Sequence, residues 1–144
     1  YDKVLDNKSC NYDGVIDTLS KLQSMDVKLG LCTNKPEKHA RELLKRLGLI
    51  DFFRGSFIGS DTVGIAKPDP KPLLEAIHRL DKKPKDVFFV GDTNTDAEAA
   101  KNANVDFIFC EYGHGSMYKL AKGESATFKI ETFADLVSIC EDKP

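Results

Sequence analysis

The chain has 144 residues, 41% of them hydrophobic, which suits one domain with a substantial core but not two ordinary ones. Its 21 Lys and Arg residues against 23 Asp and Glu residues give a net charge of -2, and the charges are interspersed, which argues against a nucleic-acid partner. No apolar run approaches the roughly 20 residues of a membrane span, and the first residues lack a signal pattern. We therefore expect a cytoplasmic protein with no membrane partner.

Apolar runs alternate with amphipathic stretches along most of the chain, which is typical of an α/β fold with a parallel sheet. Residues 1–11 are polar and show neither a strand nor a helix period, so we interpret them as a linker and 12–144 as one core domain. In chain order the patterns predict a helix around 15–22, a strand at 27–32, a helix around 43–49, a strand at 56–59, a helix around 73–80, a strand at 87–90, a helix at 95–104, strands at 107–110 and 127–130, and a helix at 133–140.

Two carboxylates follow the third predicted strand. The apolar run 87–90 ends at Gly91 and is followed by Asp92, and Asp96 comes four residues later at the start of a helical pattern. Parallel sheets bind ligands at the carboxyl ends of their strands, and Mg²⁺ prefers one or two carboxylates, several waters and a substrate phosphate. The pair therefore indicates a hard-cation site and phosphate chemistry. Alternatively, the two acids stabilise the helix dipole by about 0.3–1 kcal/mol.

Two further groups suit phosphate binding. Thr33 and Asn34 lie just past the end of the first predicted strand, where side chains and backbone N–H groups can bond phosphate oxygens. Their simpler role is to cap the helix that Pro36 opens. Lys67 precedes Pro68, which biases its backbone to an extended conformation. Its ammonium would neutralise a phosphoryl group or a nearby carboxylate, although a lone loop lysine is more often solvated.

Together these groups resemble the haloacid dehalogenase superfamily of phosphohydrolases, and within it the phosphoglycolate phosphatase-like branch. Thr33-Asn34 resembles the second motif of that superfamily, Lys67 the third, and 91–96 the fourth. Their order matches, with 34 residues from Thr33 to Lys67 (67 − 33) and 25 from Lys67 to Asp92 (92 − 67). The resemblance extends from about Tyr12 to Leu136.

The resemblance implies a Rossmann-like parallel sheet flanked by helices and a Mg²⁺-dependent hydrolase that cleaves small phosphate monoesters through a phospho-aspartyl intermediate. In that scheme Asp92 binds the metal, and Asp96 supports it directly or through water. Thr33, Asn34 and Lys67 bind the phosphoryl group, and Lys67 and Thr33 also serve as catalytic residues. Phosphoryl transfer of this kind depends mainly on positioning and electrostatic stabilisation.

The first motif of the family, which carries the nucleophilic aspartate at the end of a buried strand, has no good match. The nearest stretch, 11–16, places Asn11 at the nucleophile position, and the polar residues 6–10 before it cannot form a buried strand. A second register fits better, in which Gly14 begins the helix that precedes the second motif, 19 residues before Thr33 (33 − 14). We therefore expect a core truncated at its N-terminus, with the first strand, the nucleophile and a cap domain upstream of Tyr1.

Two consequences follow from the missing strand. In the family it lies at the sheet centre, between the strands that carry the second and fourth motifs, so its absence is expected to open the core. Either upstream residues pair with this chain, or the sheet closes in another way. The isolated chain is expected to have little or no phosphatase activity. The alternatives are a non-catalytic binding or partner module with the same fold, a phosphosugar mutase, or another small-molecule phosphatase, and the sequence indicates no oligomeric state.

Overall fold

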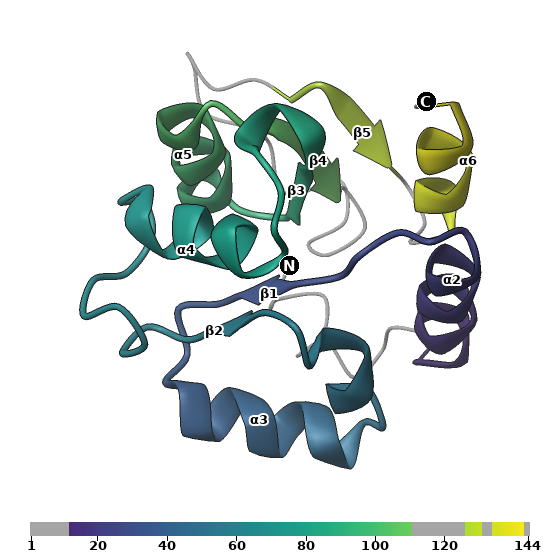
Figure 1. Ribbon diagram of the computed structural model, residues 1–144, viewed down its shortest axis with the longest axis horizontal. Helices are drawn as coiled ribbons and strands as arrows, with labels where there is room; N and C mark the ends of the chain where they lie inside the picture. The colour runs from purple at the N-terminus through teal and green to yellow at the C-terminus, as the bar shows by residue number, and fades with distance from the viewer. Residues whose placement is uncertain (1–11, 111–125, 131–133, 143–144) are drawn as a thin grey trace.

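The computed structural model describes residues 12–110, 126–130 and 134–142, so the predicted linker 1–11 lies outside the described residues. The expected alternation of helices and strands is confirmed (Figure 1). In chain order the elements are α2 (Tyr12–Ser24), β1 (Leu31–Cys32), α3 (Glu37–Arg46), β2 (Phe57–Ile58), α4 (Lys71–Arg79), β3 (Phe88–Gly91), α5 (Asn94–Ala103), β4 (Asp106–Cys110), β5 (Phe128–Ile130) and α6 (Asp135–Asp142). Two short 3₁₀ helices, Ile50–Phe53 and Pro84–Asp86, were not predicted.

No helix in the described part of the chain has the length and apolar character needed to cross a bilayer.

The strands form two parallel sheets. β1 pairs with β2, with Leu31 opposite Phe57, and a separate sheet has the order β3-β4-β5. In the second sheet Phe88 lies opposite Asp106, and Ile108 lies opposite Phe128. The predicted class, a Rossmann-like α/β fold with a parallel sheet flanked by helices, is confirmed, although the sheet is divided in two.

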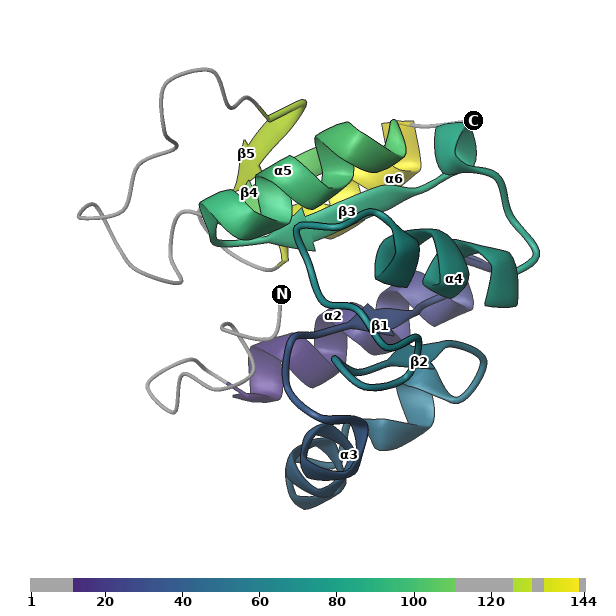
Figure 2. The same cartoon turned by 90° about the vertical axis from the view of Figure 1, so that its left-hand side faces the viewer.

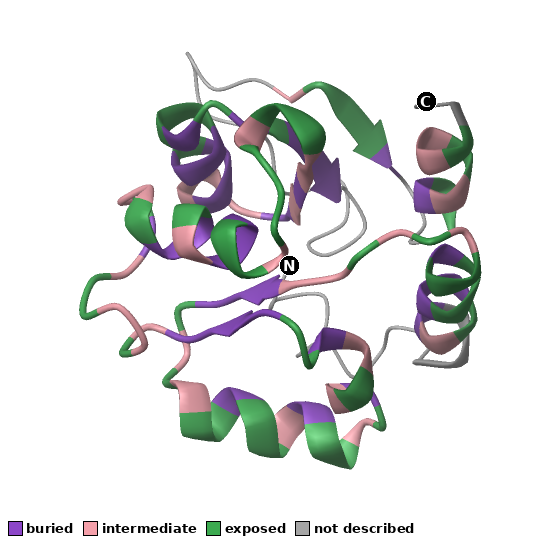
Figure 3. Ribbon diagram, in the orientation of Figure 1, coloured by how far each residue is buried: buried purple, intermediate pink, exposed green. Residues whose placement is uncertain are grey.

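Helices cover both faces of the sheets. Figures 1 and 2 show α4 and α5 on one face and α2 and α6 on the other, with α3 beyond β2. Successive strand residues therefore enter two different cores. Leu31 joins the core beneath α2 and α6, whereas Cys32 joins the core beneath α4 and α5. Because both of their faces are covered, β1, β2 and most of β4 read as continuous apolar runs and not as an alternating pattern. Figure 3 shows this burial along β1, β2 and β4.

The helix boundaries follow from local signals. α2 begins at Tyr12, so the stretch around Asp13 and Gly14 opens a helix and does not end a strand, as the second register predicts. α5 ends at Ala103, and its C-cap residue, Asn104, has a left-handed backbone (φ 59°) of the kind that asparagine tolerates at a helix C-terminus. β1 is shorter than the predicted strand 27–32, because 27–30 join no strand ladder among the described residues.

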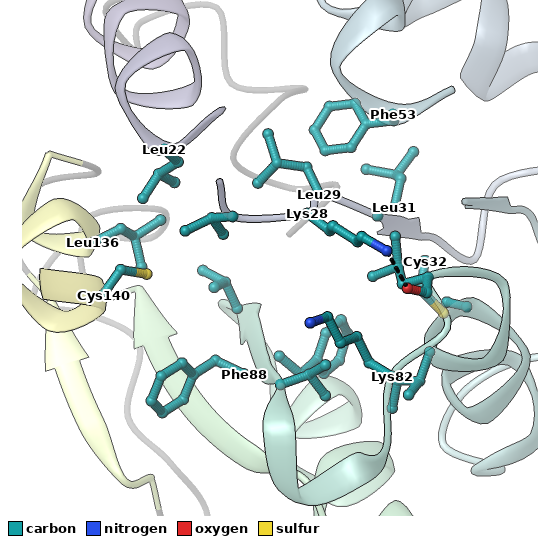
Figure 4. A pocket seen from close by; sticks show the side chains of 18 of the residues that line it. Leu22, Lys28, Leu29, Leu31, Cys32, Phe53, Lys82, Phe88, Leu136 and Cys140 are labelled. Carbon is teal, nitrogen blue, oxygen red and sulfur yellow. Dashed lines mark hydrogen bonds between the residues drawn. The ribbon is translucent and has the colours of Figure 1, made fainter. Parts of the chain in front are cut away.

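A cavity of about 410 Å³ lies between the two sheets (Figure 4). It separates β1 from β3, the strands that lead to Thr33 and Asp92, where the resemblance predicts that the core opens. Four apolar side chains in its walls, Val27, Leu29, Phe88 and Val90, are only half-buried although they lie at the centre of the fold. The space is partly open to solvent, so it is a cleft in the fold and not a sealed interior void.

Candidate active site

The residues predicted to form the site converge at the carboxyl ends of β1 and β3. Thr33 directly follows β1, and Asp92 directly follows β3. Lys67 links the end of β1 to the first turn of α5, because its Nζ lies 3.2 Å from the carbonyl oxygen of Cys32 and 2.7 Å from Oδ1 of Asp96. Parallel topology thus brings together groups that are 63 residues apart in the sequence (96 − 33).

The loop that carries Lys67 is fixed by Asn34. The Asn34 side chain accepts a hydrogen bond from the Lys67 backbone N–H (2.9 Å) and donates one to the Lys67 carbonyl oxygen (3.2 Å). The Lys67–Pro68 peptide bond is cis. The Lys67 ammonium also lies 5.3 Å from the centre of the Phe89 ring, at the range of a cation–π contact. Lys67 is consequently buried, at 5% exposure, and not solvated.

The acidic pair is built by the turn between β3 and α5. Thr93 caps α5 by accepting a hydrogen bond from the Asp96 N–H (3.1 Å), and the Asp92 N–H donates to Oδ2 of Asp96 (3.2 Å). Asp92 is 0% exposed and Asp96 is 2% exposed. The approach requires glycine at position 91, because a Cβ there would lie 2.6 Å from both Cβ and Oδ2 of Asp96. Asp96 therefore acts as a positioning residue for the backbone that carries Asp92 and for Lys67.

The electrostatics of this cluster favour the ionised carboxylate of Asp96. Burial opposes ionisation and raises its pKa, but nearby positive charge, including the Lys67 ammonium, and the hydrogen bond from Lys67 outweigh burial. The net effect lowers the pKa of Asp96 well below its usual value. Lys67 and Asp96 thus form a buried ion pair, with both side chains 2% exposed.

Thr33 lies beside this pair and is 2% exposed. Its N–H donates to the Ile58 carbonyl oxygen (2.9 Å), and its Oγ1 accepts a hydrogen bond from the Lys35 N–H (3.2 Å), which fixes the turn after β1. Thr33 and Asn34 do not cap α3. The N-cap residue of α3 is Pro36, which makes no side-chain hydrogen bond to the helix, and the Glu37 N–H donates to Oδ1 of Asp61 (2.9 Å). The capping alternative is therefore wrong. Asp61 was missed because no local pattern marks it.

Among the described residues, no third His, Cys, Asp or Glu joins Asp92 and Asp96 closely enough to form a metal cluster. Two buried carboxylates are nevertheless the oxygen donors that Mg²⁺ accepts when waters and a phosphate complete its shell. The remaining groups, a threonine hydroxyl at a strand end and a buried ammonium, suit a phosphoryl anion. The arrangement can hold a hard cation and a phosphate side by side.

The chain is similar in sequence to known proteins. Residues 1–104 match the family model described as a haloacid dehalogenase-like hydrolase. The chain is 39% identical over 132 residues to phosphoglycolate phosphatase 1 of Pseudomonas aeruginosa and 38% identical over 125 residues to phosphoglycolate phosphatase of Rhodospirillum rubrum. Those matches cover 92% and 87% of this chain, and 47% and 51% of the relatives.

Solved structures show the same similarity. A crystal structure of a predicted phosphoglycolate phosphatase from Haemophilus somnus superposes with a TM-score of 0.79 at 28% identity, over 88% of this chain and 56% of that one. The chain thus spans about half the length of the curated relatives that it matches. Because the family model covers more than half of the chain, the chain belongs to the haloacid dehalogenase-like hydrolase family.

Proposed function

We propose that this chain forms the phosphate-binding and metal-binding half of a Mg²⁺-dependent phosphate monoester hydrolase of the phosphoglycolate phosphatase type. The observation that carries the proposal is the convergence of Thr33, Lys67, Asp92 and Asp96 at one sheet edge, with Lys67 bonded to the end of β1 and to Asp96 in the first turn of α5. The names of the similar proteins support the substrate class, a small phosphorylated metabolite.

Each residue has a distinct role in the proposed reaction. The Thr33 hydroxyl and the Asn34 backbone N–H donate to oxygens of the phosphoryl group. Lys67 offsets the charge that develops on that group and orients the carboxylates around it, which is electrostatic stabilisation by a preorganised group. The Asn34 side chain holds the Lys67 backbone in place for this purpose.

Asp92 is the proposed direct Mg²⁺ ligand from this chain. Both carboxylate oxygens of Asp96 already accept hydrogen bonds, one from Lys67 and one from the Asp92 N–H, so Asp96 supports the metal through position and charge. When bound, Mg²⁺ would polarise the phosphoryl group and shield its negative charge from an attacking carboxylate.

The nucleophile is proposed to be an aspartate outside the described residues, on a strand upstream of Tyr1. Its carboxylate would attack phosphorus as the ester P–O bond breaks and the alcohol leaves with a proton, which gives a phospho-aspartyl intermediate. Water would then hydrolyse this intermediate to inorganic phosphate and the free carboxylate, so one difficult displacement becomes two easier ones. The isolated chain is accordingly expected to release no phosphate from monoesters.

The proposal is tested by assaying the complete gene product against a panel of phosphate monoesters that includes phosphoglycolate and hexose phosphates, with and without Mg²⁺. Phosphate release that depends on Mg²⁺ is the expected result. Interconversion of hexose phosphate isomers without net release would identify a phosphosugar mutase, and no turnover of any ester would identify a binding or partner module. Strong phosphatase activity in purified 1–144 alone would contradict the proposed upstream nucleophile.

A further inference from the structure

One connection, residues 59–70 between β2 and α4, contacts the turn between β1 and α3 at two places. Its later part carries Lys67, whose backbone the Asn34 side chain holds through two hydrogen bonds. Its first part, 59–62, contacts the other end of the same turn, where α3 begins at Glu37. The roles proposed for the site use only the Lys67 side and leave the contacts of 59–62 without a function.

The backbone of this first part lies directly against the turn. The Ser60 N–H donates to the Lys35 carbonyl oxygen (2.9 Å), beyond the ends of both β1 and β2. Gly59 approaches so closely that a Cβ there would lie 2.4 Å from the Glu37 nitrogen. The turn that follows Thr33 is therefore packed against 59–60 up to the start of α3.

Two side chains of the same segment hold the start of α3. Oδ1 of Asp61 accepts a hydrogen bond from the Glu37 N–H (2.9 Å), one of the first N–H groups of a helix, which have no partner within it. The Thr62 hydroxyl donates to Oε1 of Glu37 (2.8 Å) and accepts from the Gly59 N–H (2.8 Å). Arg41 donates to the other carboxylate oxygen of Glu37 (2.9 Å). Both the backbone and the side chain of Glu37 are thus tied down.

The charge of Glu37 fixes the direction of the Thr62 hydrogen bonds. The hydrogen bonds from Thr62 and Arg41 lower the pKa of Glu37, so its carboxylate is ionised near neutral pH and can only accept. The single hydroxyl proton of Thr62 is consequently directed to Glu37, and a lone pair remains for the Gly59 N–H. Thr62 therefore joins the loop after β2 to α3 through one oxygen atom.

This tie matters because the groups that it holds are close to the proposed phosphate donors. Thr33 and Asn34 lie within four residues of Glu37 on a short turn (37 − 33). Donors to a phosphoryl group stabilise the transition state only while they are held in place before the reaction, and small displacements are costly. A shift at the start of α3 would move both donors.

We propose that Thr62 is a positioning residue for phosphoryl transfer, which sets the location of the Thr33 hydroxyl and the Asn34 N–H by tying Glu37 to the loop after β2. Asp61 acts beside it through the Glu37 backbone. Thr62 acts on the substrate only through this turn. The inference rests on the proposed function, because that function places the phosphoryl group at Thr33 and Asn34.

The test uses the complete gene product, the ester of the panel with the highest kcat/KM, and vanadate, a mimic of the phosphoryl-transfer transition state. Thr62→Val keeps the shape of the side chain but removes the hydroxyl. We expect it to lower kcat/KM at least about tenfold and to weaken vanadate inhibition by a similar factor, because a transition-state analogue uses the same donors. Thr62→Ser restores the hydroxyl and is expected to return both quantities to within about twofold of the unaltered protein. Thr127→Val, the same change at an exposed threonine before β5, is expected to alter neither.

The vanadate measurement separates positioning from a loss of folded protein. Partial unfolding would lower the measured rate but would leave the vanadate inhibition constant of the folded remainder unchanged. A second pair of variants applies the same test at an exposed position, where the fold tolerates change: Asp61→Ala removes the acceptor of the Glu37 N–H, whereas Asp61→Asn keeps an acceptor oxygen. We expect Asp61→Ala to weaken vanadate inhibition at least about threefold and Asp61→Asn to leave it unchanged.

Unchanged vanadate inhibition in Thr62→Val and Asp61→Ala would overturn the inference, whatever the rates of these variants. Failure of Thr62→Ser to restore the activity would also overturn it, because the hydroxyl would then not be the group that matters. These results would leave the proposed function intact, since the unaltered protein would still hydrolyse its ester. Lack of turnover by the unaltered protein would instead refute the proposed function, and this inference with it.

Discussion

The buried Lys67–Asp96 ion pair is predicted to be a large contributor to the stability of this chain. Its atoms lie 2.7 Å apart, and both side chains are 2% exposed. Lys67→Met keeps much of the side-chain volume but leaves the Asp96 carboxylate buried without its cation. Breaking a buried pair from one side costs about 3–5 kcal/mol, a large share of the roughly 5–15 kcal/mol that holds a typical domain folded.

The exposed Arg79–Glu75 pair is the matched control. Its atoms are 2.8 Å apart, but its side chains are 39% and 34% exposed. Arg79→Met is therefore expected to cost only about 0.3–0.5 kcal/mol, as is usual for exposed pairs of this helical spacing. The two pairs have nearly the same length and differ strongly in burial.

The measurement is urea unfolding followed by circular dichroism, with the free energy of unfolding obtained by linear extrapolation. The double variant Lys67→Met/Asp96→Asn should recover much of the loss, because it no longer buries an uncompensated charge. A loss below about 1 kcal/mol in Lys67→Met, or a loss equal to that of Arg79→Met, would refute the reasoning.

Three other predictions concern neighbouring residues. Gly91→Ala should destabilise the fold by about 1–3 kcal/mol, because the added Cβ would meet Asp96 at 2.6 Å, whereas Gly55→Ala, with nothing within 4 Å, should have almost no effect in the same urea assay. The free energy of unfolding should fall as pH drops from about 5 toward 2, because the unfolded chain binds a proton at the ordinary aspartate pKa of about 3.9 while folded Asp96, with its lowered pKa, does not. Asp96→Asn should flatten that pH profile, and an unchanged slope would contradict the assignment. Gly59→Ala should also destabilise, since its Cβ would lie 2.4 Å from the Glu37 nitrogen, and a neutral result in thermal unfolding would disprove that close approach.

Local patterns were sufficient to predict the order of helices and strands, whereas the candidate residues Thr33 and Lys67 were selected by the resemblance of their motifs. The run 87–90 indicates a strand because its apolar side chains pack alternately against the two cores, and Asp92 follows where parallel sheets bind ligands. Lys67 lies in a loop and Thr33 at a strand end. Their convergence is a property of parallel topology, which places the carboxyl ends of successive strands at one edge.

Contacts between distant segments could not be predicted in the same way. The Asn34 side chain bonds the Lys67 backbone across 33 residues, and Asp61 bonds the start of α3 across 24, with no periodic signal in either stretch. The two 3₁₀ helices are too short to produce a period. The open core was expected only from the resemblance, since composition and periodicity do not reveal which strand a sheet lacks.

The most direct test of the proposed function is the effect of Asp92→Asn on Mg²⁺-dependent phosphate release by the complete gene product. Asp86→Asn, an exposed aspartate before β3, is the matched control. We expect Asp92→Asn to lower kcat/KM by at least about a hundredfold, which corresponds to about 2.7 kcal/mol of lost transition-state stabilisation, and to raise the Mg²⁺ concentration needed for half-maximal rate. We expect Asp86→Asn to change neither quantity. Equal activity and an equal Mg²⁺ requirement in both variants would contradict the assignment of this sheet edge as the phosphoryl-transfer site.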